Sequence, residues 1–98
     1  MLEETFREFD ARTRPLHPEE RMAKLRARNA VAEKFLRTNL KAGDRLRATK
    51  AECSSREASF TFSGWDGGWI MSKSGCSIAP LSVYSVNGKV LRFPVEIA

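Results

Sequence analysis

The spacing of apolar side chains changes once along this 98-residue chain, and the change separates two kinds of secondary structure. In residues 1–42 apolar residues recur every three or four positions, the spacing of one face of a helix. In residues 43–98 apolar and polar residues alternate, which is typical of strands with one buried face. A chain of this length has material for one modest hydrophobic core. We therefore expect a single α+β domain in which two amino-terminal helices pack on a small antiparallel β-structure.

The helical part predicts one short helix and one long helix. The first covers about residues 2–12 and ends before Pro15, and its apolar face consists of Leu2, Phe6 and Phe9. The second begins at the HPEE segment of residues 17–20, where proline suits the first helical position and the acids suit the positive end of the helix dipole. It runs to about Leu40, and its buried stripe consists of Met22, Leu25, Asn29, Ala32, Leu36 and Leu40. Asn29, the polar member, is expected to make a hydrogen bond to another helix.

The strand-rich part predicts a meander of about five short strands. Alternation marks strands at residues 44–50 and 58–62. Two hairpin turn signals follow, Asp66-Gly67 and Asn87-Gly88. These signals divide the part into antiparallel neighbours joined by short turns.

The end of the chain adds a further element to this meander. Pro80 is expected to open a single 3₁₀ turn before the last strands, which cover residues 84–86 and 89–93. Five strands with a 3₁₀ turn before the final one resemble an SH3-like barrel, and the resemblance covers about residues 43–94. The predicted fold is therefore two helices packed on a five-stranded SH3-like barrel.

The two tryptophans of the chain flank the first turn signal. A two-residue turn at Asp66-Gly67 pairs Gly64 with Trp69 and places Trp69 on a core face with Phe60, Phe62 and Met71. Trp65 then points to the other face and is the candidate for outward contact, although packing beneath the helical part is an equal alternative for it. A turn at Gly67-Gly68 would bury less, so we prefer the first register.

Charge is concentrated in one segment. Residues 21–50 hold ten Lys or Arg against two acids, a net charge of +8, whereas the whole chain carries +5. Four of these side chains fall in a sector of about 80° on the long helix and form a ridge about 20 Å long. This basic ridge consists of Arg26, Lys34, Arg37 and Lys41. Arg45 and Arg47 extend the basic character into the first strand; a solvated charged face is the alternative explanation.

Residues able to perform catalysis or hold a metal are few. His17 is the only histidine, and Cys53 and Cys76 are the only cysteines, so no zinc-ligand spacing exists. We expect both thiols to be reduced and packed as small apolar groups, with a disulfide as the alternative. Ser74, Gly75, Cys76 and Ser77 offer nucleophiles without a nearby activating base. We therefore expect a protein that is not an enzyme and that binds no cofactor or metal.

The terminal sequence and overall hydropathy favour a cytoplasmic protein. The first ten residues, MLEETFREFD, hold four acids and lack the basic and apolar regions of a secretory signal. No apolar run approaches the roughly twenty residues that would span a bilayer.

Three strings in the strand-rich part resemble those of small uncharacterised proteins of phages and prophages that end in a compact β-domain. They are WDGGWIMSKSG at residues 65–75, VYSVNGKV at residues 83–90 and RFP at residues 92–94. The resemblance implies an accessory phage protein that acts by binding, and it supplies no functional residues.

Charge and resemblance together suggest a binding module whose partner is nucleic acid or a nucleoprotein complex. The basic ridge, Arg45 and Arg47 would neutralise phosphates, and Trp65 would stack on a base or on a partner side chain. The alternative is an anti-CRISPR-like phage inhibitor that docks on an acidic surface of a host defence protein. The sequence predicts neither the identity of the partner nor the oligomeric state.

Overall fold

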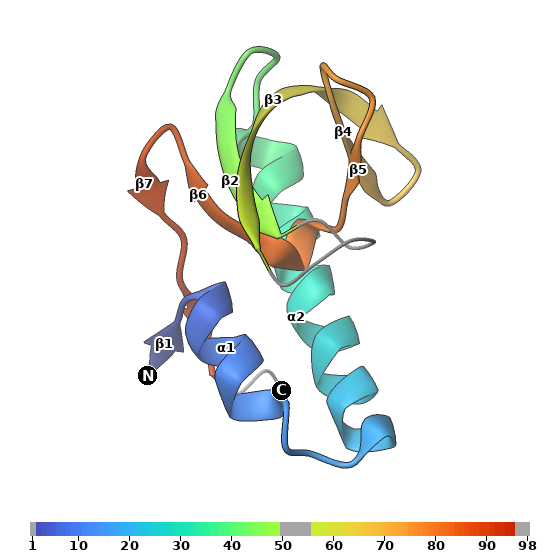
Figure 1. The fold of residues 1–98 in the computed structure, drawn as a ribbon, viewed down its shortest axis with the longest axis vertical. Coiled ribbons are helices and arrows are strands. Elements are labelled where there is room, and N and C mark those ends of the chain that lie inside the picture. The colour runs from blue at the N-terminus through green and yellow to red at the C-terminus, as the bar shows by residue number, and fades with distance from the viewer. Residues whose placement is uncertain (1, 50–55, 96–98) are drawn as a thin grey trace.

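The computed structural model describes residues 2–49 and 56–95, and it is an α+β fold with two helices and an antiparallel sheet (Figure 1). The helices are α1 (Phe6–Thr13) and α2 (Pro18–Asn39), and a 3₁₀ turn, η1, covers Pro80–Ser82. The strands are β1 (Glu3–Glu4), β2 (Arg45–Thr49), β3 (Glu57–Asp66), β4 (Trp69–Ser72), β5 (Ser77–Ile78), β6 (Val83–Val86), β7 (Lys89–Val90) and β8 (Phe93–Pro94). The α+β prediction is confirmed.

The main sheet is open, so the predicted five-stranded SH3-like barrel is not confirmed. Its six strands follow the order β5-β4-β3-β2-β6-β7, and β5 and β7 form its two edges. The predicted strand over residues 89–93 is interrupted: its first part is β7, and its end belongs to β8, which pairs with β1 in a separate two-stranded sheet. Because β8 leaves the main sheet for β1, the last segment of the chain does not pair with β5 to close a barrel.

The first helix begins later than predicted. Thr5 caps α1: its hydroxyl oxygen accepts a hydrogen bond from the Glu8 N–H at 3.2 Å, and the Glu8 carboxylate accepts one from the Thr5 N–H at 3.0 Å. This reciprocal cap satisfies two backbone donors at the helix start. Leu2, placed in the helix by its spacing, is 79% exposed and precedes β1 instead.

The long helix has the predicted boundaries, but only part of the predicted stripe is buried. Ala32 and Leu36 are fully buried against the sheet, whereas Met22 is 48% exposed because the first turns of α2 extend beyond the sheet (Figure 1). Asn29 makes its hydrogen bond to η1 rather than to a helix: its Oδ1 accepts from the Leu81 N–H at 3.1 Å. The helix is therefore fixed to the sheet by its carboxyl-terminal half and to η1 by its middle.

The hairpin between β3 and β4 adopts the register that the sequence analysis rejected. Asp66 pairs with Trp69 and Trp65 with Ile70, so the loop is Gly67-Gly68. Gly67 has a positive φ of 60° and Gly68 does not, as a type II′ turn requires. The turn that the sequence analysis preferred, Asp66-Gly67, would have forced Asp66 to a positive φ, which glycine adopts at lower cost.

A bulge completes the change of register. The pairing shifts between Phe62 and Gly64, which leaves Ser63 as the extra residue. The core face therefore carries Phe62 before the bulge and Trp65 after it, and Trp65 packs on the core while Trp69 is 47% exposed. The predicted core position of Trp69 is wrong, and Trp65 takes the alternative that was left open for it, packing beneath the helical part.

Two predictions about the last strands are confirmed. Asn87 and Gly88 have positive φ values of 51° and 82°, as a two-residue type I′ turn requires. The 3₁₀ turn begins at Pro80.

Cys76 is half-buried and packs on the core, whereas Cys53 lies outside the described residues, so the predicted thiol state of the pair stays a prediction.

Candidate binding surfaces

Arg37, a member of the basic ridge, makes its contacts within the molecule. Its guanidinium carbon lies 4.1 Å from the centroid of the Trp65 ring, and its Nη2 donates to the Gly67 carbonyl. Its Nε also donates to Glu33 one turn earlier on α2, at 3.0 Å. Arg37 thus joins the hairpin to α2 and lies over the half-buried Trp65 ring, while its own side chain stays 42% exposed.

The other three members of the basic ridge remain available. Arg26, Lys34 and Lys41 are exposed, and none of them forms an ion pair in the described parts of the chain. Arg26 and Lys34 occupy exposed positions of α2. Lys41 follows the end of α2 at Asn39, and the extended backbone of Leu40 takes it out of the helical spacing, so the predicted ridge does not continue along the helix to Lys41.

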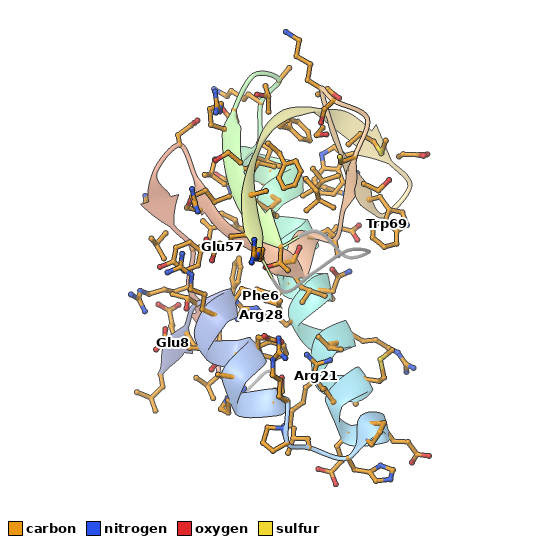
Figure 2. The ribbon with its side chains drawn as sticks, viewed as in Figure 1. Phe6, Glu8, Arg21, Arg28, Glu57 and Trp69 are labelled. Carbon is orange, nitrogen blue, oxygen red and sulfur yellow. The ribbon has the colours of Figure 1, made fainter. Side chains whose placement is uncertain are left out.

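The exposed aromatic side chain on the neighbouring hairpin is Trp69. It projects outward from the β3–β4 hairpin (Figure 2), whose tip meets α2 at two places. The Gly67 carbonyl oxygen accepts the Arg37 hydrogen bond. A Cβ atom added at Gly68 would lie 3.5 Å from a Glu33 carboxylate oxygen, so the backbone of Gly68 lies close to this side chain. Trp69 and the three free cations therefore belong to adjoining elements, and we call this set the α2–hairpin surface.

Arg45 and Arg47 lie on a different surface. They alternate along β2 with Leu46 and Ala48, which are buried against α2, so the arginines point to the opposite face of the sheet. The predicted six cations consequently do not form one continuous site.

Arg47 is also engaged on that face. Its Nε donates to Glu57 at 3.3 Å, and Arg7 of α1 holds the same carboxylate through two nitrogens. Hydrogen bonding from Arg7, followed by the charge of Arg7 and by Arg47, lowers the pKa of Glu57 below its ordinary value, against the opposing effect of burial. This cluster joins α1 to β3, whereas Arg45 forms no ion pair with the residues that the structure describes.

Sequence reasoning missed one buried residue altogether. Arg28 is only 1% exposed and lies between the rings of Phe9 and Phe93, 5.1 Å from each centroid (Figure 2). Its position three residues after Leu25 and four before Ala32 is the spacing of the buried stripe, and this signal could have identified it. Burial lowers the pKa of Arg28 to about 10, so the guanidinium remains charged at neutral pH.

The described residues contain no group of three or more His, Cys, Asp or Glu side chains placed to hold a metal ion. None of the helices in the described ranges combines the length and apolar character needed to cross a membrane. Comparisons with protein-family models, curated proteins and solved structures each returned no match to this chain.

Proposed function

We propose that the protein is a non-enzymatic binding module that contacts nucleic acid, alone or within a nucleoprotein complex, through the α2–hairpin surface. The carrying observation is the position of Arg26 and Lys34 on α2, the helix that the Trp69 hairpin contacts, and of Lys41 just after it; these three cations form no ion pair with the described residues. The cations would neutralise backbone phosphates, and the indole would stack on a base. Trp69 takes the role that the sequence analysis had given to Trp65.

The geometry supports binding with little sequence preference. Arg and Lys side chains meet phosphates, which are the same at every nucleotide, and an aromatic ring stacks on any base. Three phosphate contacts are few, so we expect weak binding with a modest logarithmic salt slope of about two to three.

A second candidate function uses the same surface. In it, the protein is a phage-type inhibitor, anti-CRISPR-like in action, that docks on an acidic region of a host protein. An exposed tryptophan with cations on the adjoining helix is also a common centre of a protein interface, which supports this alternative.

We also propose that the open sheet is related to the SH3-like barrel, because a meander is followed by a 3₁₀ turn and further strands.

The test is binding of a short duplex and a short single strand at several salt concentrations. Replacing Arg26, Lys34 and Lys41 together by Gln should reduce the logarithmic salt slope by about two to three, at 0.7 to 0.9 for each lost phosphate contact. Trp69→Ala should weaken binding about fivefold or more at every salt concentration and leave the slope unchanged, because stacking releases no counterions.

The matched control removes three charges elsewhere: Arg14, Lys73 and Arg92 are replaced by Gln. This variant lowers the net charge equally, so a slope reduced as much as in the α2 variant would indicate a non-specific effect and contradict the proposed surface. A separate Arg45→Gln variant tests the opposite sheet face. Absence of wild-type binding at low salt, with capture of an acidic host protein that Trp69→Ala abolishes, would favour the inhibitor function instead.

A further inference from the structure

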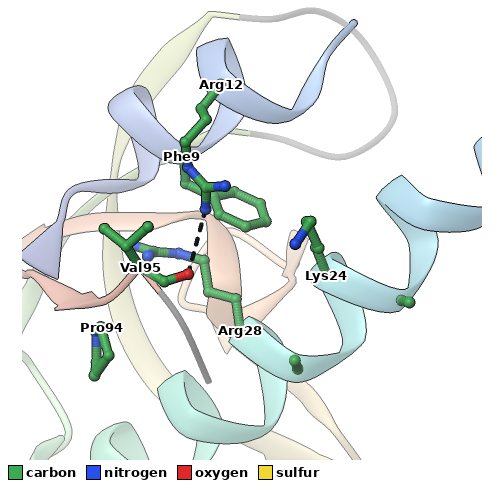
Figure 3. A pocket seen from close by; sticks show the side chains of 8 residues that line it. Phe9, Arg12, Lys24, Arg28, Pro94 and Val95 are labelled. Atoms are coloured by element: carbon green, nitrogen blue, oxygen red, sulfur yellow. Dashed lines mark hydrogen bonds between the residues drawn. The ribbon is translucent and has the colours of Figure 1, made fainter. Parts of the chain in front are cut away.

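A pocket separate from the α2–hairpin surface lies between α1, α2 and the end of β8 (Figure 3). Its volume is about 220 Å³, room for about seven water molecules at ~30 Å³ each. Its walls are mostly apolar, and its cationic members come from both helices; the lining residues are Phe9, Arg12, Ala23, Lys24, Ala27, Arg28, Pro94 and Val95. Phe9 and Arg28 are buried at its base, whereas Ala23 is exposed at its rim.

Arg28 has an unused pair of donors. Its Nη1 donates to the Glu4 carbonyl oxygen at 3.3 Å, but its Nε and Nη2 are buried and have no hydrogen-bond partner among residues 2–49 and 56–95. Leaving buried donors of a charged group unpaired is costly. The faces of the flanking Phe9 and Phe93 rings stabilise the positive charge of Arg28. They do not accept hydrogen bonds from Nε and Nη2, whose N–H bonds lie in the plane of the guanidinium.

The same pair of atoms binds a carboxylate at two other arginines of this chain. Arg7 holds Glu57 through Nε and Nη2, with an Nη2 to Oε1 distance of 2.6 Å. Arg12 holds Glu4 in the same way, at 3.1 and 2.6 Å. This edge of the guanidinium matches the two oxygens of a carboxylate. Arg28 presents the same edge without a carboxylate.

The charge around the pocket is mainly positive. Of the described residues that line the pocket or contact its arginines, Arg12, Lys24 and Arg28 are cationic, and Glu4 alone is acidic. Burial disfavours the charged form of Arg28 most, the Glu4 charge favours it, and the Arg12 charge disfavours it to a smaller extent. An anion between Arg12 and Arg28 would reduce their repulsion and satisfy the two unpaired donors.

We propose that this pocket binds the carboxylate of a small organic acid, with the Nε and Nη2 groups of Arg28 as its donors and the apolar walls around its carbon chain. Apolar walls favour a carboxylate with a short aliphatic body over inorganic phosphate, which has no apolar part. Since solvent does not reach the two donors, the half-buried Val95 and Lys24 at the pocket wall must move slightly for the ligand to enter. The site is independent of the nucleic-acid proposal.

The test is an NMR titration of the Arg28 Nε–H signal with sodium butyrate at constant ionic strength; the signal is assigned by its loss in Arg28→Lys. We expect a saturable shift with a Kd of about 10 mM or below, as suits so small a ligand. Acetate should bind several-fold more weakly, because it lacks most of the apolar body. Butyramide, which is uncharged, and inorganic phosphate should not produce a saturable shift.

Variants locate the site. Arg28→Lys keeps the charge but loses the edge formed by Nε and Nη2. It should weaken butyrate binding at least tenfold, as measured by the backbone amide signals near the pocket. Lys24→Gln changes a half-buried side chain at the pocket wall, keeps the buried Arg28 in place and should weaken binding about threefold. Lys73→Gln removes the same charge far from the pocket and should change nothing. No saturable shift in the wild type, or equal effects of Lys24→Gln and Lys73→Gln, would overturn the proposal.

One further variant tests whether the chain supplies the carboxylate itself. Glu96 follows Val95 directly in the sequence, so the titration is repeated on Glu96→Gln. Butyrate binding equal to that of the wild type supports a free organic acid as the ligand. Binding that appears only in Glu96→Gln would overturn the external ligand and assign the pocket to the chain's own side chain.

Discussion

The guanidinium carbon of Arg37 lies 4.1 Å from the centre of the Trp65 ring, so a side chain of α2 covers the tryptophan that opens the β3–β4 hairpin. The other side of Trp65 meets Phe62 edge-on, with ring centres 6.1 Å apart. The half-buried indole thus packs between the helix and the sheet core. This contact joins the β3–β4 hairpin to α2.

The two tryptophans should contribute unequally to stability. Trp65→Ala removes a large side chain packed on the core and should lower the free energy of unfolding by about 2–4 kcal/mol. Trp69→Ala removes an exposed side chain and should cost under about 1 kcal/mol. Urea unfolding of both variants measures the difference. A larger loss for Trp69 would mean that the hairpin adopts the other register in solution.

Asn29 should be important for the position of η1. Asn29→Ala leaves the partly buried N–H of Leu81 without its acceptor and should destabilise the protein by about 1–3 kcal/mol. Asn39→Ala is the matched control, because the amide of Asn39 donates to Phe35 on the exposed end of the same helix and should cost about 0.5 kcal/mol or less. Thermal and urea unfolding compare the two. Equal losses would show that the bond to Leu81 has no special weight.

Glu57 should make stability depend on pH in the acidic range. Its pKa is lowered in the folded state, first by the hydrogen bond from Arg7, so the ionised form is the one that stabilises the fold. The contribution is therefore complete above the unfolded pKa of about 4.3 and is lost as the pH falls through the lower folded value. The stability difference between wild type and Glu57→Gln should be largest near pH 7 and shrink toward pH 3. A difference that is constant over this range would contradict the assignment.

The cap of α1 should depend on a single hydroxyl group. Thr5→Val keeps the volume of this buried side chain but removes the acceptor of the Glu8 N–H, and should cost about 1 kcal/mol. Thr5→Ser keeps the acceptor and should cost less than the valine variant. Unfolding monitored by circular dichroism ranks the two. The reverse order would indicate that the methyl group, rather than the cap, stabilises this helix end.

Local signals in the sequence were sufficient for the elements that depend on neighbouring residues. Pro18 at the first helical position set the start of α2, and the Asn87-Gly88 pair set the last hairpin turn, because both signals act through their own backbone preferences. The exposed positions of Arg26 and Lys34 on α2 also follow directly from helical spacing, whereas Lys41 lies after the end of the helix.

The tertiary structure alone decided which of two possible hairpin registers forms, and therefore which tryptophan faces solvent. Each register has an acceptable turn sequence, and a one-residue bulge at Ser63 exchanges the faces of every residue that follows it. The choice rests on the packing of Trp65 against Phe62 and Arg37, which come from β3 and a distant helix. Helical spacing places Arg28 in line with the buried stripe, but only the tertiary structure supplies its aromatic neighbours, because Phe9 and Phe93 meet when α1 and β8 fold together around α2.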